Sequence, residues 1–229
     1  PSTVLRALPT SWVDMPTTID REAWPAAAVG AVPAVLAALT GRLRLSLALA
    51  ALPVGIVAFF RDPERAVAAD VDTVLAPADG KVMHAGPGQP GVAPEGDWQQ
   101  ISIFLSVFDV HINRTPYGGT VTDVQYRPGK WHAAYKFESA TENERSDITI
   151  ERAVGTSIRK VVFRQIVGLV ARRVVTRIGV GDVLETGDRI GLMKFGSRMD
   201  IFVPPEVSLS VAAGDRTVAG VTVLGRWPS

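Results

Sequence analysis

The amino-acid sequence predicts a mainly β protein of the α+β class, with a compact barrel-like β sandwich as its core and an apolar helical hairpin before it. Three observations support this fold. Two apolar runs lie close together before residue 61, short apolar runs separated by Gly and Pro fill the rest of the chain, and Gly-Asp turns connect the last of these runs. We therefore divide the chain into an apolar, membrane-associating segment, residues 1–65, and a β-rich domain, residues 66–229.

The predicted hairpin consists of two apolar runs, AWPAAAVGAVPAVLAAL at 23–39 and LSLALAALPVGIVAFF at 45–60. Their 17 and 16 residues fall short of the roughly 20 that span a bilayer. Three prolines within them are expected to interrupt helical hydrogen bonding. Arg42 and Arg44 in the connecting turn would have to cross the membrane if both runs spanned it. We therefore favour a hairpin lodged in one leaflet, with a helical pair packed on a soluble core as the alternative.

The second part of the chain has the residue pattern of a β protein. Its β-branched content and its spacing of Gly and Pro indicate short strands and few helices. The candidate strands are, in chain order, TVLAPA, GKVMHAG, QQISIFLS, GTVTDVQYR, DITIERAV, IRKVVFRQIVG, ARRVVTRIG, DRIGLMKFG, MDIFVP, VSLSVAA and TVAGVTVLG. The turn-strand-turn rhythm of the last segments is common in barrel-like sandwiches.

Composition excludes several classes of function. The 229 residues contain no Cys, so disulfides, thiolate metal sites and a Cys nucleophile are ruled out. Lys and Arg together (24) nearly balance Asp and Glu (23), whereas proteins that bind the phosphate backbone usually carry a basic excess. We therefore expect no nucleic-acid partner, and the three His residues indicate no metal cluster.

Candidate chemistry centres on a Gly-Ser pair, Gly196 and Ser197, inside KFGSRMD. Such a pair in a β-rich run is often only a bend, and it does not form the Gly-x-Ser-x-Gly elbow of serine hydrolases. Asp79 in LAPADGKV and His111 in FLSVFDVHINRTP are two other polar residues set in apolar surroundings. Asp, His and Ser are the residue types that activate a hydroxyl group, although spacing along the chain does not show that they meet.

Six motifs in chain order extend this observation to a family. Together they resemble the phosphatidylserine decarboxylase proenzymes of the short bacterial and archaeal type, over about Phe59 to Gly225. The motifs are FFRDPER, APADGKV, IFLSVFDVHINRTP, ENER, QIVGLVARR and KFGSRMD.

The resemblance implies a self-processing carboxy-lyase. The peptide bond between Gly196 and Ser197 would be cut by serinolysis into a β chain, 1–196, and an α chain, 197–229, that remain associated. Ser197 would become a covalent pyruvoyl group, the carbonyl that accepts the electron pair left when phosphatidylserine loses its carboxyl group and becomes phosphatidylethanolamine. No other cofactor is implied.

The resemblance also implies the roles of individual residues in cleavage. Ser197 would be the nucleophile and pyruvoyl precursor, and Gly196 its scissile partner. Asp79 would orient His111, and His111 would act as the base for processing and as a later proton donor.

A second set of residues would bind the substrate: Arg114, His132, Asn143 and Glu144. The long-type bacterial enzymes carry a second His where this chain has Arg114. A single imidazole would then serve both steps, or one step would use another acid or water, while Arg114 would bind the carboxylate or phosphate of the substrate.

Two other functions remain open at this point. The enzyme would be a decarboxylase for another seryl phospholipid, such as an archaetidylserine, or the chain would be a non-catalytic, membrane-anchored adaptor with a lipoyl-like barrel. For the decarboxylase we expect a peripheral or monotopic location on the cytoplasmic face of the cell membrane, an anionic phospholipid substrate and a homodimer.

Overall fold

A computed structural model describes residues 17–169, 173–194 and 196–228. Contacts within the chain divide it into two units, Pro1–Ala66 and Val67–Ser229. Each unit is described by itself below.

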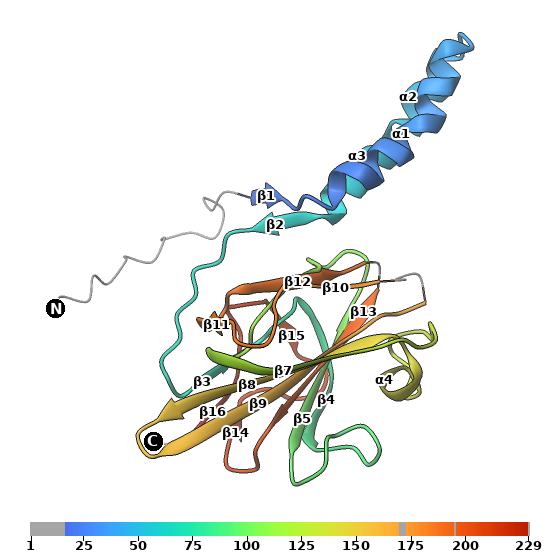
Figure 1. Cartoon of the computed structure of the whole chain (residues 1–229). Coiled ribbons are helices and arrows are strands. Elements are labelled where there is room, and N and C mark those ends of the chain that lie inside the picture. The colour runs from blue at the N-terminus through green and yellow to red at the C-terminus, as the bar shows by residue number, and fades with distance from the viewer. Residues whose placement is uncertain (1–16, 170–172, 195, 229) are drawn as a thin grey trace, which may run out of the picture. The chain divides into compact units, whose positions relative to one another are not determined.

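The first unit is the helical hairpin. It consists of β1 (Thr17–Ile19), α1 (Ala23–Leu39), α2 (Leu43–Leu49), α3 (Ala51–Phe59) and β2 (Arg61–Pro63). Strand β1 pairs with β2 in antiparallel fashion, so the two ends of the hairpin are joined at its base. Helix α1 runs alongside α2 and α3 (Figure 1). The two apolar runs thus form a helical hairpin as predicted, with the second run divided after Leu49.

The prolines interrupt the helices less than the sequence led us to expect. Pro25 and Pro53 are the third residues of α1 and α3, in the first turn, where backbone N–H groups have no intrahelical acceptor to lose. Pro33 lies inside α1, and the helix continues through it. Among the described residues, no helix combines the length and the hydropathy of a membrane-crossing segment.

The helices pack closely on each other and expose apolar side chains elsewhere. A Cβ added to Gly30 of α1 would lie 2.5 Å from Cδ1 of Ile56 in α3, so the absence of a side chain permits the close approach. On the exposed side, Val29, Leu39 and Leu47 are 73%, 79% and 67% accessible. An apolar helical surface of this kind is unusual in water and indicates an interaction surface.

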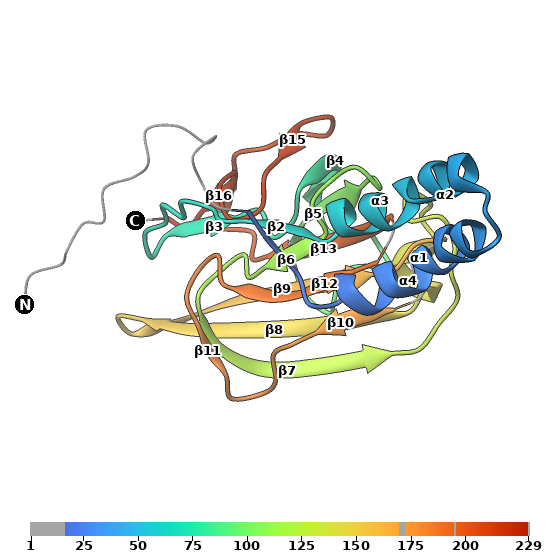
Figure 2. The ribbon, with the colours of Figure 1, turned by 90° about the horizontal axis from the view of Figure 1, so that it is seen from above.

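The second unit is built from antiparallel sheets, which confirms the mainly β prediction. Its largest sheet has eight strands in the order β11-β7-β8-β9-β13-β5-β4-β15, and two three-stranded sheets have the orders β10-β12-β6 and β14-β16-β3. Figures 1 and 2 show the large sheet, curled, with β7, β8 and β9 as long neighbouring strands. The elements are β3 (Thr73–Leu75), β4 (Gly80–Pro87), β5 (Gln99–Leu105), β6 (Ile112–Arg114), β7 (Gly119–Arg127), α4 (Ser139–Glu142), β8 (Arg145–Val154), β9 (Ser157–Ile166), β10 (Val174–Thr176), β11 (Val183–Leu184), β12 (Arg189–Met193), β13 (Ser197–Val203), β14 (Ser208–Leu209), β15 (Arg216–Thr217) and β16 (Val223–Arg226).

Alternation along the strands gives the large sheet an apolar inner face. Ile148 of β8, Phe163 of β9, Ile201 of β13 and Ile101 of β5 are paired across four neighbouring strands, and all four are fully buried. Because side chains on one strand point alternately to the two faces, the residues between them reach the opposite face. Strand β13 lies in the middle of this arrangement, between β5 and β9.

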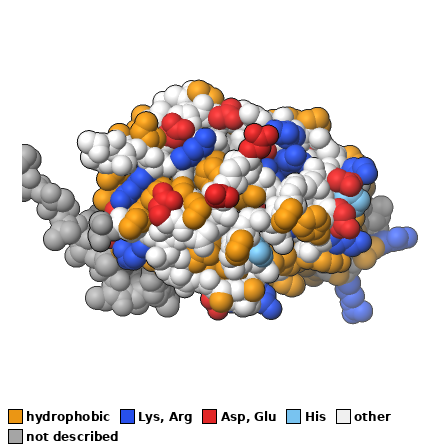
Figure 3. All heavy atoms as spheres, turned by 90° about the horizontal axis from the view of Figure 1, so that it is seen from below, with side chains coloured by type: hydrophobic (Ala, Val, Ile, Leu, Met, Phe, Trp, Pro, Cys, Tyr) orange, Lys and Arg blue, Asp and Glu red, His pale blue; other side chains and the backbone are white. Residues whose placement is uncertain are grey.

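The surface has a mixed charge, in keeping with the formal net charge of +1. On the face shown in Figure 3, basic, acidic and hydrophobic side chains are interspersed. On this face the basic side chains do not gather into the kind of stripe by which proteins usually bind a nucleic-acid backbone.

Candidate active site

Gly196 and Ser197 lie where the chain enters the middle of the large sheet. Ser197 is the first residue of β13, is paired with Leu105 of β5, and is fully buried. Among the described residues, its hydroxyl oxygen finds no hydrogen-bond partner. Gly196 has a φ of +66°, in the left-handed region that favours glycine. The bend therefore delivers the Ser197 hydroxyl group, unpaired as far as the described residues go, to the interior, directly after a backbone conformation that disfavours other residues.

His111 contacts the residue before this hydroxyl group. The backbone N–H of Gly196 donates to Nε2 of His111 over 3.2 Å, and Nδ1 of His111 lies 2.9 Å from the carbonyl oxygen of Asp109. Because Gly196 N is a donor, Nε2 must accept, and Nδ1 then carries the proton and donates a hydrogen bond to the backbone carbonyl oxygen of Asp109. His111 is 2% exposed, so these contacts set the tautomer of its imidazole inside the protein. No sequence pattern had indicated this role of the Asp109 carbonyl.

Asp79 and Arg114 each lie beside the turn at residues 219–220. Asp79 accepts a hydrogen bond of 2.8 Å from the backbone N–H of Ala219. Arg114 is 5% exposed and donates to the carbonyl of Gly187 over 2.9 Å, and a Cβ on Gly220 would lie 3.0 Å from its Cδ atom. These contacts place both side chains beside the turn at residues 219–220.

Asn143 and His132 are brought together by backbone hydrogen bonds. The Asn143 side chain accepts from the N–H of His132 (2.7 Å) and donates to the carbonyls of His132 and Val167 (both 2.8 Å). Asn143 is fully buried. The His132 ring is partly exposed, with Nε2 3.0 Å from a carboxylate oxygen of Glu142. Asn143 thus ties the loop that carries His132 to the end of β9.

Glu144 holds the other side of the same segment. Its backbone carbonyl accepts from Val167 N–H (3.1 Å) and its carboxylate from Val174 N–H (3.1 Å). Partial desolvation, followed by this carboxylate, raises the pKa of Tyr126, an exposed side chain, above its usual value. Asn143 and Glu144 therefore fix the chain on both sides of residues 168–173, of which 170–172 lie outside the described residues.

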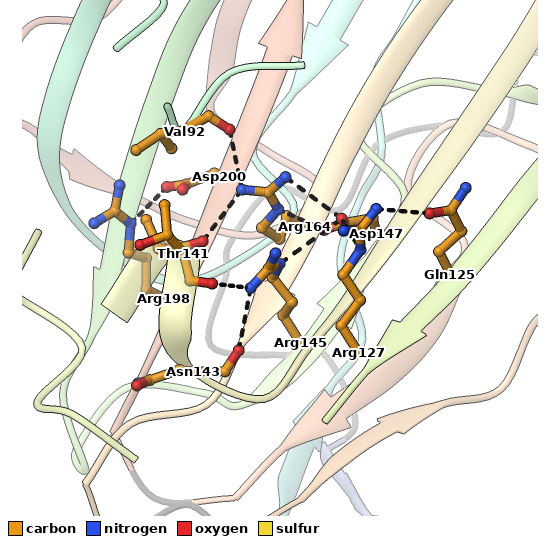
Figure 4. A network of polar contacts seen from close by, with 11 residues as sticks. Val92, Gln125, Arg127, Thr141, Asn143, Arg145, Asp147, Arg164, Arg198 and Asp200 are labelled. Atoms are coloured by element: carbon orange, nitrogen blue, oxygen red, sulfur yellow. Dashed lines mark hydrogen bonds and ion pairs between the residues drawn. The ribbon is translucent and has the colours of Figure 1, made fainter. Parts of the chain in front are cut away.

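The outer face of the large sheet carries a buried polar network (Figure 4). The Arg164 guanidinium forms an ion pair with Asp147 and donates to the carbonyls of Val92 and Ala140, and Arg145 also approaches Asp147. Burial, together with the nearby Arg164 charge, lowers the pKa of Arg145. The network fastens the segment around α4 to β8 and β9.

A second buried ion pair begins directly after Ser197. Nε of Arg198 lies 2.6 Å from Oδ1 of Asp200, and the guanidinium also donates to the Ser102 hydroxyl group over 3.1 Å. Arg198 and Asp200 are 4% and 0% exposed. These contacts hold β13 against β5 on one face of the sheet. Because side chains alternate along a strand, the Ser197 side chain lies on the opposite face.

Comparison with known proteins relates this site to one family. The family model described as "Phosphatidylserine decarboxylase" matches residues 55–225. A protein of Magnetococcus marinus is 46% identical over 168 residues, covering 73% of this chain and 76% of its own. Proteins of Geobacter metallireducens and Geotalea uraniireducens are 42% and 40% identical over 217 and 212 residues, each alignment covering 93% of this chain and 98% of the relative. All three are named "Phosphatidylserine decarboxylase proenzyme".

Proposed function

Since the chain belongs to the phosphatidylserine decarboxylase family and is a carboxy-lyase for phosphatidylserine, we propose that it makes its own pyruvoyl group by cutting itself between Gly196 and Ser197. The observation that carries this proposal is the buried Ser197 hydroxyl group, unpartnered within the described part of the chain, next to a glycine in left-handed conformation. An unpaired buried hydroxyl group costs free energy, and such costs gather at functional sites.

In the proposed self-cleavage, the Ser197 oxygen attacks the carbonyl carbon of Gly196. The C–N bond breaks, a C–O bond forms, and the hydroxyl proton passes to the nitrogen of Ser197, so an ester replaces the amide. Loss of the Ser197 Cα proton then breaks the bond between Cβ and oxygen, which releases the Gly196 carboxylate and leaves dehydroalanine. Water replaces the nitrogen, which departs as ammonia, and the α chain, 197–229, begins with a pyruvoyl group while the β chain, 1–196, ends at Gly196.

His111 is the proposed base for this sequence. Its Nε2 lone pair faces the amide N–H of Gly196, one residue from the attacking hydroxyl group. Its Nδ1–H donates a hydrogen bond to the backbone carbonyl of Asp109. A neutral imidazole whose Nε2 carries no proton is the form that accepts one. The orienting role of Asp79 remains a prediction, which the processing rate of Asp79→Asn tests against that of His111→Ala.

When formed, the pyruvoyl group supplies a carbonyl that serves as the electron sink for the decarboxylation. The residues present suit it, because Ser197 is buried and no described residue competes for its oxygen. We propose that Arg114 contributes charge to substrate binding, that His132 lines the pocket for the substrate head group, and that Asn143 and Glu144 shape the site through the loops they hold. For Arg114→Lys and His132→Ala, an increase in KM with little change in kcat is expected.

Intact-mass measurement of freshly purified protein tests the proposed function. We expect two fragments separated at Gly196 and Ser197, with the smaller one carrying the mass of a pyruvoyl terminus. Ser197→Ala is expected to give one uncut chain with no decarboxylase activity. A contiguous wild-type chain that turns over phosphatidylserine would contradict the mechanism. Seryl phospholipids with other tails and backbones, assayed in parallel, define which substrate is preferred.

We further propose that the enzyme associates with the membrane peripherally or monotopically, on the cytoplasmic face, through the helical hairpin. The support is the exposure of apolar side chains on α1 and α2. In sedimentation with vesicles containing phosphatidylserine, Val29→Asp is expected to reduce binding. Val183→Asp, at an equally exposed position of β11 (76% against 73%), provides the matched control.

The predicted homodimer is tested by sedimentation velocity of the detergent-solubilised protein.

A further inference from the structure

Gly168, just beyond the end of β9, touches the carbonyl group that the proposed cleavage attacks. A Cβ added to Gly168 would lie 2.0 Å from the carbonyl oxygen of Gly196 and 3.0 Å from its carbonyl carbon. Cβ atoms do not approach backbone oxygens so closely, so any side chain at residue 168 requires one of the two backbones to move. The hydrogen atom that stands in place of this Cβ faces the Gly196 oxygen.

Two glycines therefore determine the position of one carbonyl group, for different physical reasons. Gly196 adopts a φ of +66°, but a Cβ on it would meet no atom of the described chain within 4 Å. Gly168 has no φ in the left-handed region, and its requirement is space alone. Alanine at residue 196 would be opposed by backbone conformation, whereas alanine at residue 168 would be opposed by contact with the carbonyl group.

The backbone around Gly168 has little freedom to move away. Val167 donates its N–H to the Glu144 carbonyl (3.1 Å), and its own carbonyl accepts from the buried side chain of Asn143 (2.8 Å). A Cβ at residue 168 would also lie 3.2 Å from the Cβ of Ala134, on the loop that covers it. The displacement caused by a side chain at 168 is therefore expected to fall on the Gly196 carbonyl group.

We propose that Gly168 is a positioning residue for self-cleavage, the surface against which the Gly196 carbonyl is held in the orientation that Ser197 attacks. This inference rests on the proposed function. During attack the carbonyl carbon becomes tetrahedral and its oxygen swings out of the amide plane. Since a hydrogen atom of Gly168, and not a side chain, stands beside that oxygen, the site accommodates both geometries. A misplacement of about 1 Å in such an arrangement is enough to slow a reaction roughly 100-fold.

The test follows the cleavage of newly synthesised full chain by denaturing gel and intact mass. We expect Gly168→Ala to be cut roughly 100-fold more slowly than the wild-type chain. Gly179→Ala is the open control, because its Cβ would meet no described atom within 4 Å. Gly225→Ala is the crowded control, because its Cβ would lie 2.8 Å from a different backbone oxygen, that of Ser208. Both controls are expected to be cut at the wild-type rate, and equal slowing in Gly225→Ala would overturn the inference.

Two further measurements separate positioning from general damage. Ala134→Gly removes the second neighbour, so the double variant Gly168→Ala/Ala134→Gly should remain slow; restored cleavage would show that the loop contact, and not the carbonyl group, was responsible. Hydroxylamine cuts an ester but not an amide. It should not accelerate cutting of Gly168→Ala, because the attack itself is impaired, and rapid cutting by hydroxylamine would refute the inference.

Folding is checked by melting Gly168→Ala in the uncut Ser197→Ala background. If alanine at 168 prevents folding, Asn143→Asp carries the test, because it loses the donor to the Val167 carbonyl without adding a side chain beside the oxygen. Slower cleavage of Asn143→Asp is then expected, and a wild-type rate would overturn the inference. A wild-type chain that is never cut would instead refute the proposed function, so the two failures are distinguishable.

Discussion

Replacing Asn143 with Ala should destabilise the β-rich unit by a predictable amount. The substitution removes three hydrogen bonds, to the N–H and carbonyl of His132 and to the carbonyl of Val167. The Val167 bond is buried, and leaving a buried carbonyl unpaired costs about 1–3 kcal/mol. The two His132 groups are partly exposed and regain water, so we assign them roughly 0.5 kcal/mol each. The expected loss is about 2–4 kcal/mol.

Thermal melting measures this loss in the Ser197→Ala background, where the chain stays contiguous and cleavage does not complicate the transition. For a chain of this length about 1 kcal/mol shifts the melting temperature by roughly 2–4 °C, so Asn143→Ala should melt about 4–16 °C lower. Gln125→Ala is the matched control: this amide bonds the exposed side chains of Asp123 and Arg127, and a shift within about 0.5 kcal/mol is expected. If Asn143→Ala and Gln125→Ala have the same melting temperature, the hydrogen bonds of Asn143 do not hold the loop to β9.

Three other predictions concern the sheet and its neighbours. Arg198→Met should lose about 3–5 kcal/mol in urea unfolding of the uncut chain, because it leaves the buried Asp200 carboxylate unpaired; an unchanged midpoint would contradict this. Gly196→Ala should lose about 1–2 kcal/mol in the same assay, since its φ of +66° disfavours a side chain, and a stabilised variant would be inconsistent with that conformation. Tyr126 should ionise above pH 10.0, because partial desolvation and the Glu144 carboxylate raise its pKa. Its contribution to stability is therefore complete below pH 10.0 and is lost as pH rises through the raised pKa. Ultraviolet titration of wild type against Tyr126→Phe isolates this phenol, and Glu144→Gln should lower its pKa; no change would remove Glu144 as a cause.

The apolar patterns predicted the large elements well, because burial decides them. The run at 23–39 forms α1 with the same bounds, although Gly30 and Pro33 within it both disfavour a helix interior. The second run splits into α2 and α3 around Ala50, a division that its uniform hydropathy did not reveal. Strand β6, Ile112–Arg114, was not predicted. Two of its three residues are polar, and three residues are too few to show the alternation of polar and apolar residues that indicates a strand.

The candidate site was harder to predict, because it depends on contacts between distant residues. His111 and Gly196 meet although 85 positions separate them, and only the fold shows that contact. The role of the Asp109 carbonyl had no sequence signal, since every residue has such a group. Gly168 reads as an ordinary loop glycine in QIVGLVARR, and its significance rests on an oxygen 28 positions further along the chain.

The central place of β13 bears on how the enzyme is made. Its neighbours β5 and β9 both belong to the part of the chain before residue 197, so the strand is flanked on each side by the other proposed fragment. A cut at its first residue leaves a ribbon threaded through the sheet, with hydrogen bonds along both edges. Such a ribbon can leave only if the sheet comes apart. Folding must therefore precede cutting. Two mature molecules should not exchange their small fragments, and active enzyme should not form readily from the two fragments expressed as separate polypeptides.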